Sequence, residues 1–444
     1  MPRVSLSIRT RRHRLHARGR LTVFDAPGQY ASILIKPINL KTRGDLVEIW
    51  MTQEEACHAL GVRKQTLYAY VSRGRIEVRW DPEHASRKLY RGSDVAALRK
   101  KRDLGRAHKS IAASTMAWGE PIINTRISTI ARGRLYYRGH DAIELASRAT
   151  LEEVAGYLWE ADAAPDFPTF DDDVSVPEGA PPRARVYASI ALAAAQPRAS
   201  GALDAARLNE EAARLVGRFA SAFVGPGEIG RFGTSGALHL RLACAWRCEA
   251  QADLLRRALA LLADQELTTS AFAARVAAST GASLGSCMLA GLAAFAGPLH
   301  GDAALRVQAL LGNVREMGVV AAVERWLKAN GPLPGFGHEL YPQGDPRAAD
   351  LLAAFDAPDE VRALIEYVHV SRGLAPTIDI ALTALASYCR LPDDAVFALF
   401  AIGRSVGWMA HAIEQMTSGT LLRPRANYIG PAGATRDAGN HQES

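Results

Sequence analysis

The residues with the clearest chemical potential lie in a loop rich in glycine and proline, from Leu333 to Ala348. The loop reads Leu-Pro-Gly-Phe-Gly-His-Glu-Leu-Tyr-Pro-Gln-Gly-Asp-Pro-Arg-Ala. Glycines let a backbone approach a ligand closely, and prolines stiffen a loop. His338 and Arg347 are therefore held where they could donate a proton or bind an anion. The alternative is an ordinary rigid loop whose histidine bonds a carbonyl.

Two further motifs set a titratable side chain among glycine or apolar residues. Gly297-Pro-Leu-His-Gly places His300 between glycines after a long apolar segment, and Pro-Thr-Ile-Asp379 places one acid in an apolar helical run. A buried acid is costly unless it is paired or used in chemistry. Asp379 is thus a candidate base, and a helix cap near Pro376 is the alternative.

Two more arginines have glycine, proline or apolar neighbours. Arg404 lies in Gly-Arg-Ser-Val-Gly-Trp, and Arg423 lies in Leu-Arg-Pro-Arg. A lone arginine is usually a surface charge. Together with Arg347, however, these arginines are better explained as bidentate hydrogen-bond donors to a substrate that carries two carboxylates.

Taken in order, these motifs resemble the signatures of the citrate synthase family, from about residue 115 to Pro431. The resemblance implies that Asp379 removes a methyl proton from the acetyl thioester of coenzyme A. Neutral His300 would donate to the enolate oxygen, and His338 would donate to the ketone oxygen of oxaloacetate. Hydrolysis of the citryl thioester would drive the reaction, and no metal or redox cofactor is expected.

The same resemblance assigns the binding residues. Arg347, Arg404 and Arg423 would hold the carboxylates of oxaloacetate, and in a homodimer Arg423 would reach the neighbour's site. The residues expected to bind coenzyme A are Pro334, Gly335, Phe336 and Gly337.

Three positions depart from the family's usual pattern. Gln265 replaces a histidine that helps to bind oxaloacetate, and Thr268 replaces an asparagine. Glutamine donates a neutral hydrogen bond but cannot become cationic, so the site could accept another 2-oxo acid. Asp302 stands where a small residue is common, and its carboxylate would repel an anionic substrate unless it turns away.

The body of the chain is expected to be mainly α. From Val186 onward, alanine- and leucine-rich helical patterns dominate, with few alternating β-branched runs. The resemblance implies a large helical domain over residues 115–302 and 391–432, with a smaller helical domain inserted over residues 303–390. Residues 433–444 would form a tail.

A small domain over residues 51–104 precedes the body. Thr52 and Glu55 form a capping box for a first helix, and a second helix covers residues 64–72 before a strand and a wing. This segment resembles the winged helix-turn-helix of MerR-like regulators and excisionases, although such modules also dock proteins. The residues expected to face DNA are Lys64, Gln65, Thr66, Tyr68, Tyr70, Arg73 and Arg75.

The front of the chain is basic. The first 110 residues carry 24 basic and 10 acidic side chains, and the remainder is net acidic, which suggests a first part that binds a polyanion. Residues 1–50 are expected to be poorly ordered, as a transit peptide, a nucleic-acid-binding arm or sequence upstream of a start at Met51. Residues 105–114 form a polar linker.

Five scattered cysteines without a Cys-x-x-Cys pair indicate a reducing compartment and argue against a zinc site. The longest strongly apolar run, residues 287–297, is shorter than the roughly 18 residues that a membrane span needs. We therefore expect a cytoplasmic condensing enzyme fused to a DNA-binding-like module. The competing hypothesis is a DNA-binding regulator whose catalytically impaired body senses a metabolite. A third is that the front module docks a protein.

Overall fold

The computed structural model describes residues 50–99 except 83, and residues 123–426 except 172, 173, 182 and 197–203. These residues belong to two compact units, one before and one after the boundary at residues 122 and 123. The predicted extension before residue 50, the linker over residues 105–114 and the tail over residues 433–444 lie outside the described residues. Each unit is described by itself.

The first unit contains the predicted helix-turn-helix. Helix α1 spans Gln53–Leu60, and α2 spans Lys64–Ser72, as the sequence predicts. Thr52 and Glu55 form the predicted capping box. Gly61 ends α1 with a φ of 60°, a left-handed conformation that glycine adopts without strain. Local chemistry therefore determines where these helices begin and end.

A three-stranded antiparallel sheet completes the first unit, in the order β1-β3-β2. Strands β2 (Val78–Trp80) and β3 (Lys88–Arg91) form the predicted wing. Strand β1 (Trp50–Met51) pairs with the other edge of β3, and this strand was not predicted. A third helix covers residues 92–99. The core of the unit consists of Ala56, Leu60, Leu67, Ile76, Tyr90 and Val95.

The second unit, the body, begins with a small antiparallel sheet of β4 (Ser128–Ala131), β5 (Arg134–Tyr137) and β6 (His140–Asp141). Everything after it is helical, so the protein is mainly α, as predicted. The helices are α4 (Ala142–Ala146), α5 (Leu151–Trp159), α6 (Ala184–Ala194), α7 (Ala205–Val224), α8 (Ile229–Phe232), α9 (Leu238–Ala245), a 3-10 turn (Glu249–Gln251), α10 (Ala252–Leu262), α11 (Thr269–Ser279), α12 (Leu284–Phe295), α13 (Ala303–Met317), α14 (Val319–Asn330), α15 (Pro346–Leu352), α16 (Asp359–Arg372), α17 (Ile378–Cys389) and α18 (Ala395–Ser418).

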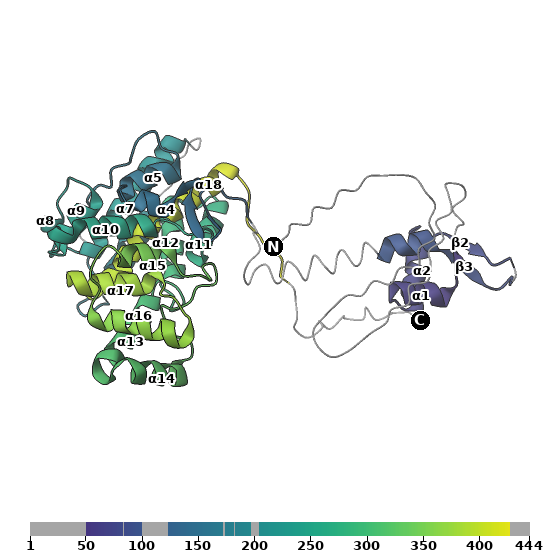
Figure 1. Ribbon diagram of the computed structural model, residues 1–444. Coiled ribbons are helices and arrows are strands. Elements are labelled where there is room, and N and C mark those ends of the chain that lie inside the picture. Colours follow the sequence, from purple (N-terminus) through teal and green to yellow (C-terminus); the bar gives the residue numbers. More distant parts are fainter. Residues whose placement is uncertain are drawn as a thin grey trace, which may run out of the picture. The chain divides into compact units, whose positions relative to one another are not determined.

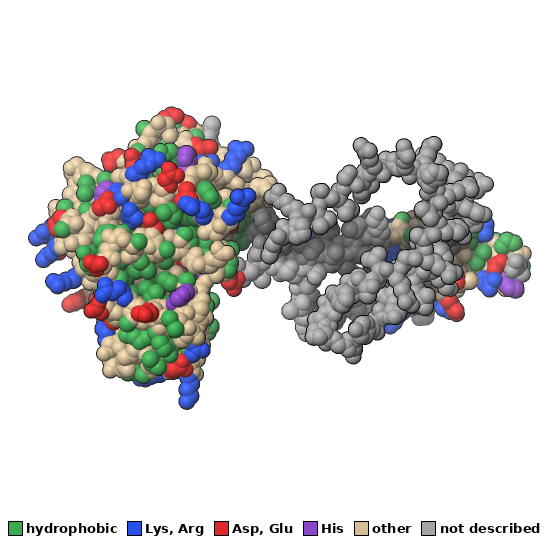
Figure 2. All heavy atoms as spheres, in the orientation of Figure 1, with side chains coloured by type: hydrophobic (Ala, Val, Ile, Leu, Met, Phe, Trp, Pro, Cys, Tyr) green, Lys and Arg blue, Asp and Glu red, His purple; other side chains and the backbone are tan. Residues whose placement is uncertain are grey.

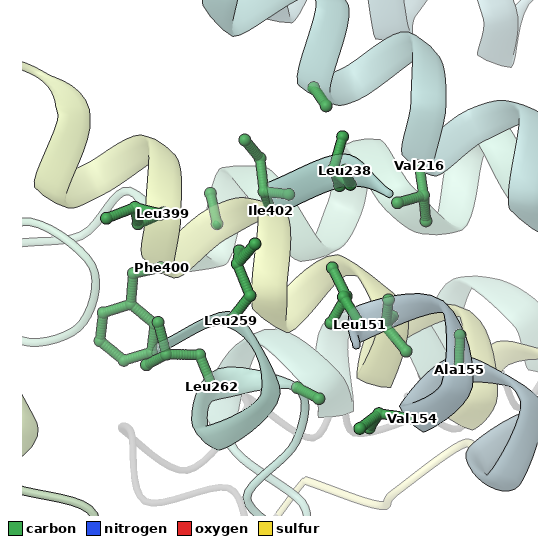
Figure 3. Packing of buried hydrophobic residues seen from close by; sticks show 14 of the residues in the cluster. Leu151, Val154, Ala155, Val216, Leu238, Leu259, Leu262, Leu399, Phe400 and Ile402 are labelled. Atoms are coloured by element: carbon green, nitrogen blue, oxygen red, sulfur yellow. The ribbon is translucent and has the colours of Figure 1, made fainter. Parts of the chain in front are cut away.

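Helix α18 lies at the centre of the body. It is buried along almost its whole length and packs against α5, α7, α10, α11 and α12. Figure 3 shows Leu399 and Ile402 of α18 among buried side chains of other helices. The packing is tight, because a Cβ at Gly407 would lie 2.4 Å from the carbonyl oxygen of Ala263. Side chains on α18 are therefore held firmly.

By length and composition alone, α18 could cross a membrane, the one helix of the described residues that could. Its apolar window is entirely buried inside the body. Arg404, His411 and Glu414 interrupt the apolar run. This burial is that of a core helix.

The last turns of α18 bind the segment that enters the body. Glu414 accepts hydrogen bonds from Thr125 Oγ1 at 2.8 Å and from the Arg126 backbone nitrogen at 2.7 Å. Arg275 of α11 forms an ion pair with Glu414 at 2.8 Å and donates to the carbonyl of Asn124 at 3.1 Å. Residues near the end of the body thus fix its beginning.

A second hydrophobic core is formed by α13, α14, α16 and one face of α17. Figure 1 shows α13, α14 and α16 gathered at one end of the body. Helices α13 to α17 lie within the range 303–390 predicted for the inserted domain. On the visible face of the body, acidic and basic side chains are interspersed (Figure 2).

Candidate active site

The loop that carries His338 is fastened to the start of α17. The Gly337 backbone nitrogen donates to the Ala375 carbonyl at 2.9 Å, and the Thr377 nitrogen donates to the Gly335 carbonyl at 2.8 Å. Gly335 has a φ of 75°, and a Cβ there would lie 2.6 Å from a side-chain carbon of Ile380. The loop therefore requires glycine at this position.

Asp379 lies in the first turn of α17. The N-cap of this helix is Thr377, so Asp379 is not the helix cap that the sequence left as an alternative. The Thr377 hydroxyl donates to Asp379 Oδ2 at 2.9 Å. Burial raises the pKa of the Asp379 carboxyl above its ordinary value. A raised pKa makes the ionised carboxylate a stronger base.

His300 is held through its Nε2 atom. Ser270 Oγ lies 2.8 Å from His300 Nε2, accepts from Trp408 Nε1 at 3.0 Å and lies 3.2 Å from Thr268 Oγ1. Because the indole can only donate and Thr268 can donate the second bond, the proton of Ser270 is directed to Nε2. His300 therefore carries its own proton on Nδ1.

The His300 ring is neutral. Burial, with a smaller contribution from the Arg404 charge, lowers the pKa of His300 to about 3. Phe295 packs edge-on against the ring at a centroid distance of 4.8 Å. A neutral imidazole with its proton on Nδ1 can donate a hydrogen bond there at ordinary pH.

Gln265 joins His338 to Arg347. Its Oε1 accepts from Arg347 Nη1 at 2.8 Å, and because guanidinium only donates, this bond directs the amide nitrogen toward His338. Gln265 Nε2 lies 3.1 Å from His338 Nε2, and the Leu340 backbone nitrogen donates to His338 Nδ1 at 3.1 Å. His338 thus carries its proton on Nε2, and two donors face one another with no acceptor between them.

Both histidines are therefore disfavoured as cations. Burial, followed by the charge of Arg347, lowers the pKa of His338. Arg347 is itself paired, since its Nε and Nη2 donate to the two oxygens of Asp345 at 3.0 and 2.8 Å. Both partners of this ion pair are buried. The Asp345 carboxylate also accepts from the Ile378 nitrogen at 3.1 Å, which ties Arg347 to the start of α17.

Arg404 is a buried cation, and two of its nitrogens have no hydrogen-bond acceptor in the described part of the chain. Its Nε donates to the Leu262 carbonyl at 2.9 Å, but among the described residues Nη1 and Nη2 have no partner. Burial, with repulsion from Arg347, lowers the pKa of Arg404 to about 10. Arg404 is near enough to His300 and Arg347 to affect both. It therefore links the two halves of the site. The charge of Asp264 acts on it, but among these residues its two terminal nitrogens still lack hydrogen-bond acceptors.

Arg423 is exposed beyond the end of α18. No contact between Arg423 and the buried arginines is present in the described chain. Its predicted role in a partner's site stays a prediction.

A cavity of about 210 Å³ opens beside His338 and is bordered by Tyr341, His369 and Leu374. Of the four residues predicted to bind coenzyme A, Gly337 lines this cavity. Gly335 is half-buried, whereas the side chains of Pro334 and Phe336 are buried. Phe336 packs in the second hydrophobic core, and its predicted contact with coenzyme A stays a prediction. Tyr341, His369 and Leu374 were not predicted, since no local pattern distinguishes them.

The carboxylate of Asp302 does not stand free. Arg183, which precedes α6, donates to Asp302 at 2.5 Å and to Asp394 at 2.6 Å. Its guanidinium also stacks over the ring of Phe397 at 3.4 Å. Because this ion pair offsets the charge of Asp302, the expected repulsion of an anionic substrate is relieved. Thr268 has a clear role as well, since its side chain caps α11.

The residues predicted to contact DNA lie on or just after α2. Tyr68 is half exposed, and its hydroxyl accepts from Gln53 at 2.9 Å. Tyr70 is partly buried and packs against the core of the first unit. Its contact with DNA stays a prediction. The exposed ones are Lys64, Gln65, Thr66, Tyr68, Arg73 and Arg75.

Comparison with protein families gives two matches. The model of the citrate synthase C-terminal domain matches residues 116–425, and a helix-turn-helix domain model matches residues 50–103. Putative citrate synthase 2 of Mycobacterium tuberculosis is 36% identical over 182 residues, which are 38% of this chain and 49% of the relative. Citrate synthase 2 of Bacillus subtilis is 34% identical over 195 residues, 41% of this chain and 52% of the relative. The chain thus spans about half the length of the curated relatives it matches.

Solved structures extend the likeness over the whole body. Citrate synthase from Thermotoga maritima superposes with a TM-score of 0.57 at 28% identity, covering 70% of this chain and 94% of that one. Citrate synthase from Thermoplasma acidophilum, in a ternary complex with carboxymethyl coenzyme A and oxaloacetate, gives a TM-score of 0.58 at 27% identity, covering 72% and 96%. With a family model that matches more than half of its length, the chain belongs to the citrate synthase family.

Proposed function

We propose that the protein condenses acetyl-coenzyme A, or another short acyl-coenzyme A, with oxaloacetate or a related 2-oxo acid and then hydrolyses the thioester. One observation carries this proposal: Asp379, a buried carboxyl with a raised pKa, and two histidines with lowered pKa values are linked through Arg347 and Arg404. The charge of Arg347 acts on Asp379, His338 and Arg404, and the charge of Arg404 acts on His300. A strong base and neutral donors are what enolisation of a weakly acidic thioester needs. Neither metal nor redox cofactor enters this chemistry.

Each group has one task. Asp379 takes a proton from the α-carbon of the acyl group, and the Nδ1–H of His300 donates to the enolate oxygen as charge develops. The enolate carbon attacks the ketone carbon of the oxo acid, and the Nε2–H of His338 stabilises the alkoxide and protonates it. Arg347 and Arg404 hold the carboxylates and orient the ketone. Water then cleaves the thioester, which releases coenzyme A and the tricarboxylic acid or its analogue.

We infer a homodimer in the cytoplasm, with Arg423 completing the partner's site. The family membership supports the dimer, and the scattered free cysteines support a reducing compartment. Sedimentation of the full chain tests the dimer.

The direct test is release of free thiol from acetyl- and propionyl-coenzyme A with oxaloacetate, pyruvate and 2-oxoglutarate. We expect release with at least one pair. If every pair is inert, the proposed activity is wrong.

Gln265→His is expected to lower the apparent KM for oxaloacetate about tenfold, because a histidine can add a charged donor toward a carboxylate. The KM for the acyl thioester should not change. Gln265→Glu is the matched control, since it keeps the shape but removes the amide donor and adds repulsion. An unchanged KM in Gln265→His would show that Gln265 does not limit oxaloacetate use.

The second candidate is a metabolite-sensing DNA-binding regulator, which the basic exposed face of α2 supports. A helix-turn-helix that binds DNA should lose affinity as salt rises. Substituting Lys64, Arg73 and Arg75 by alanine should weaken binding at all sequences alike. Sequence-selective binding without thiol release would favour this candidate, and absence of binding at low salt would leave a protein-docking role for the domain.

A further inference from the structure

Tyr341 has a buried hydroxyl whose proton lacks an acceptor. Only 2% of the residue is exposed, and among the described residues no acceptor lies at hydrogen-bonding geometry to its Oη. The ring lies 4.8 Å from that of His338 and 5.4 Å from the Arg347 guanidinium carbon. Tyr341 also borders the cavity of about 210 Å³. A hydroxyl so placed is costly unless a ligand satisfies it.

The polar groups around this hydroxyl are those of the oxo-acid site. Besides Arg347, the charge of Arg404 acts on it, and the amide of Gln265 can donate to its oxygen. Such a bond leaves the proton of the hydroxyl without an acceptor. Burial raises the pKa of Tyr341 to about 12, so the hydroxyl keeps its proton at any physiological pH. It is therefore a permanent donor beside the open donors of Arg404.

Three donor atoms lack an acceptor here: Tyr341 Oη, Arg404 Nη1 and Arg404 Nη2. An arginine cannot accept a hydrogen bond, so these groups cannot satisfy one another completely. A carboxylate offers two oxygens with about four lone-pair positions and can accept from all three. The missing partner thus has the chemistry of a carboxylate.

We propose that Tyr341 is a substrate-binding residue that, with Arg404, holds the carboxylate next to the ketone of a 2-oxo acid. This inference rests on the proposed function. The contact between the rings of Tyr341 and His338 supports the choice of carboxylate, because His338 addresses the ketone oxygen and the neighbouring carboxylate shares a carbon with it. The hydroxyl makes the site selective for oxo acids over ketones and aldehydes that lack this group.

The test is calorimetric titration of oxaloacetate, pyruvate and 2-oxoglutarate into the full-length protein and its Tyr341→Phe variant. We expect Tyr341→Phe to weaken binding of each oxo acid that binds the unaltered protein about tenfold, the usual loss for one hydrogen bond to a charged group. In turnover, the KM for the oxo acid should rise while the KM for the acyl thioester stays constant. Tyr388→Phe, on the exposed face of α17, is the matched control and should change nothing.

Thermal unfolding separates binding from structure. Without ligand, Tyr341→Phe should unfold at or above the temperature of the unaltered protein, because the proton of the lost hydroxyl has no protein acceptor. A lower unfolding temperature, or oxo-acid binding within twofold of the unaltered protein, would overturn the inference, as would failure of all three oxo acids to bind. Binding of an oxo acid needs no turnover. If no thiol were released in any assay, the proposed reaction would be refuted, but the binding measurements would still test the role of Tyr341.

Discussion

Asp379→Asn is expected to lower kcat for thiol release by about 10²- to 10⁴-fold, because asparagine keeps the shape of the side chain but cannot accept the proton of the acyl group. Binding of the oxo acid, measured by calorimetry, should stay close to that of the unaltered protein. The amide can still accept from the Thr377 hydroxyl, so the local hydrogen bond survives. A large loss of kcat without loss of binding is the expected pattern for a base.

The pH profile gives an independent test of the same role. Burial raises the pKa of Asp379, and only the ionised carboxylate is a base, so kcat should fall as pH falls through this raised pKa. His300, with a pKa of about 3, stays neutral throughout and adds no step near neutrality. Asp350→Asn is the matched control: this aspartate also has a raised pKa but pairs with Arg257. If Asp379→Asn retained its activity, the base would have to be another group.

Arg404→Met is expected to raise the Kd for the oxo acid by at least two orders of magnitude. The same substitution should stabilise the unliganded protein. Burial lowers the pKa of Arg404 to about 10 from 12.5. Below pH 10 this shift corresponds to about 3 kcal/mol of destabilisation, because the folded state disfavours the charged form relative to the unfolded state. Methionine fills similar space without the charge. Calorimetric titration and urea unfolding measure the two effects.

Arg256→Met is the matched control for this prediction. Arg256 is also buried, but its guanidinium is fully engaged with Asp253 and the carbonyls of Ala146, Ser147 and Ala149. Its removal should destabilise the body and leave oxo-acid binding intact. Equal loss of stability in the two variants would contradict the view that Arg404 awaits an anion.

The sequence was sufficient to predict features that neighbouring residues determine, such as the ends of α1. The capping box of Thr52 and the glycine at position 61 predicted both ends of α1. Strand β1 was missed because two residues have no detectable period, and only pairing with Arg91 and Tyr90 makes Trp50–Met51 a strand. The partial burial of Tyr70 was not predicted, because packing against the core of the first unit is not visible in a single helical pattern.

The candidate site shows the same division. The types of His300, His338 and Asp379 suggested their chemistry, but their protonation depends on partners distant in sequence. The Ser270 hydroxyl directs the proton of His300 from 30 positions away. Asp302 was expected to repel the substrate, because the sequence did not reveal its ion-pair partner. That partner, Arg183, lies 119 positions earlier. Tyr341 carries no motif, and only the absence of an acceptor for its hydroxyl proton reveals it.

The hydrogen bonds of Glu414 have a consequence for the order of events on the ribosome. They join α18 to Thr125 and Arg126 across 289 and 288 positions, whereas the described helix-turn-helix has all its core residues between positions 56 and 95. The first domain can fold as soon as its own residues leave the exit tunnel. The body must wait for α18, which supplies both Arg404 and the hydrogen bonds to Thr125 and Arg126. A nascent chain therefore gains its helix-turn-helix while most of the body is still untranslated.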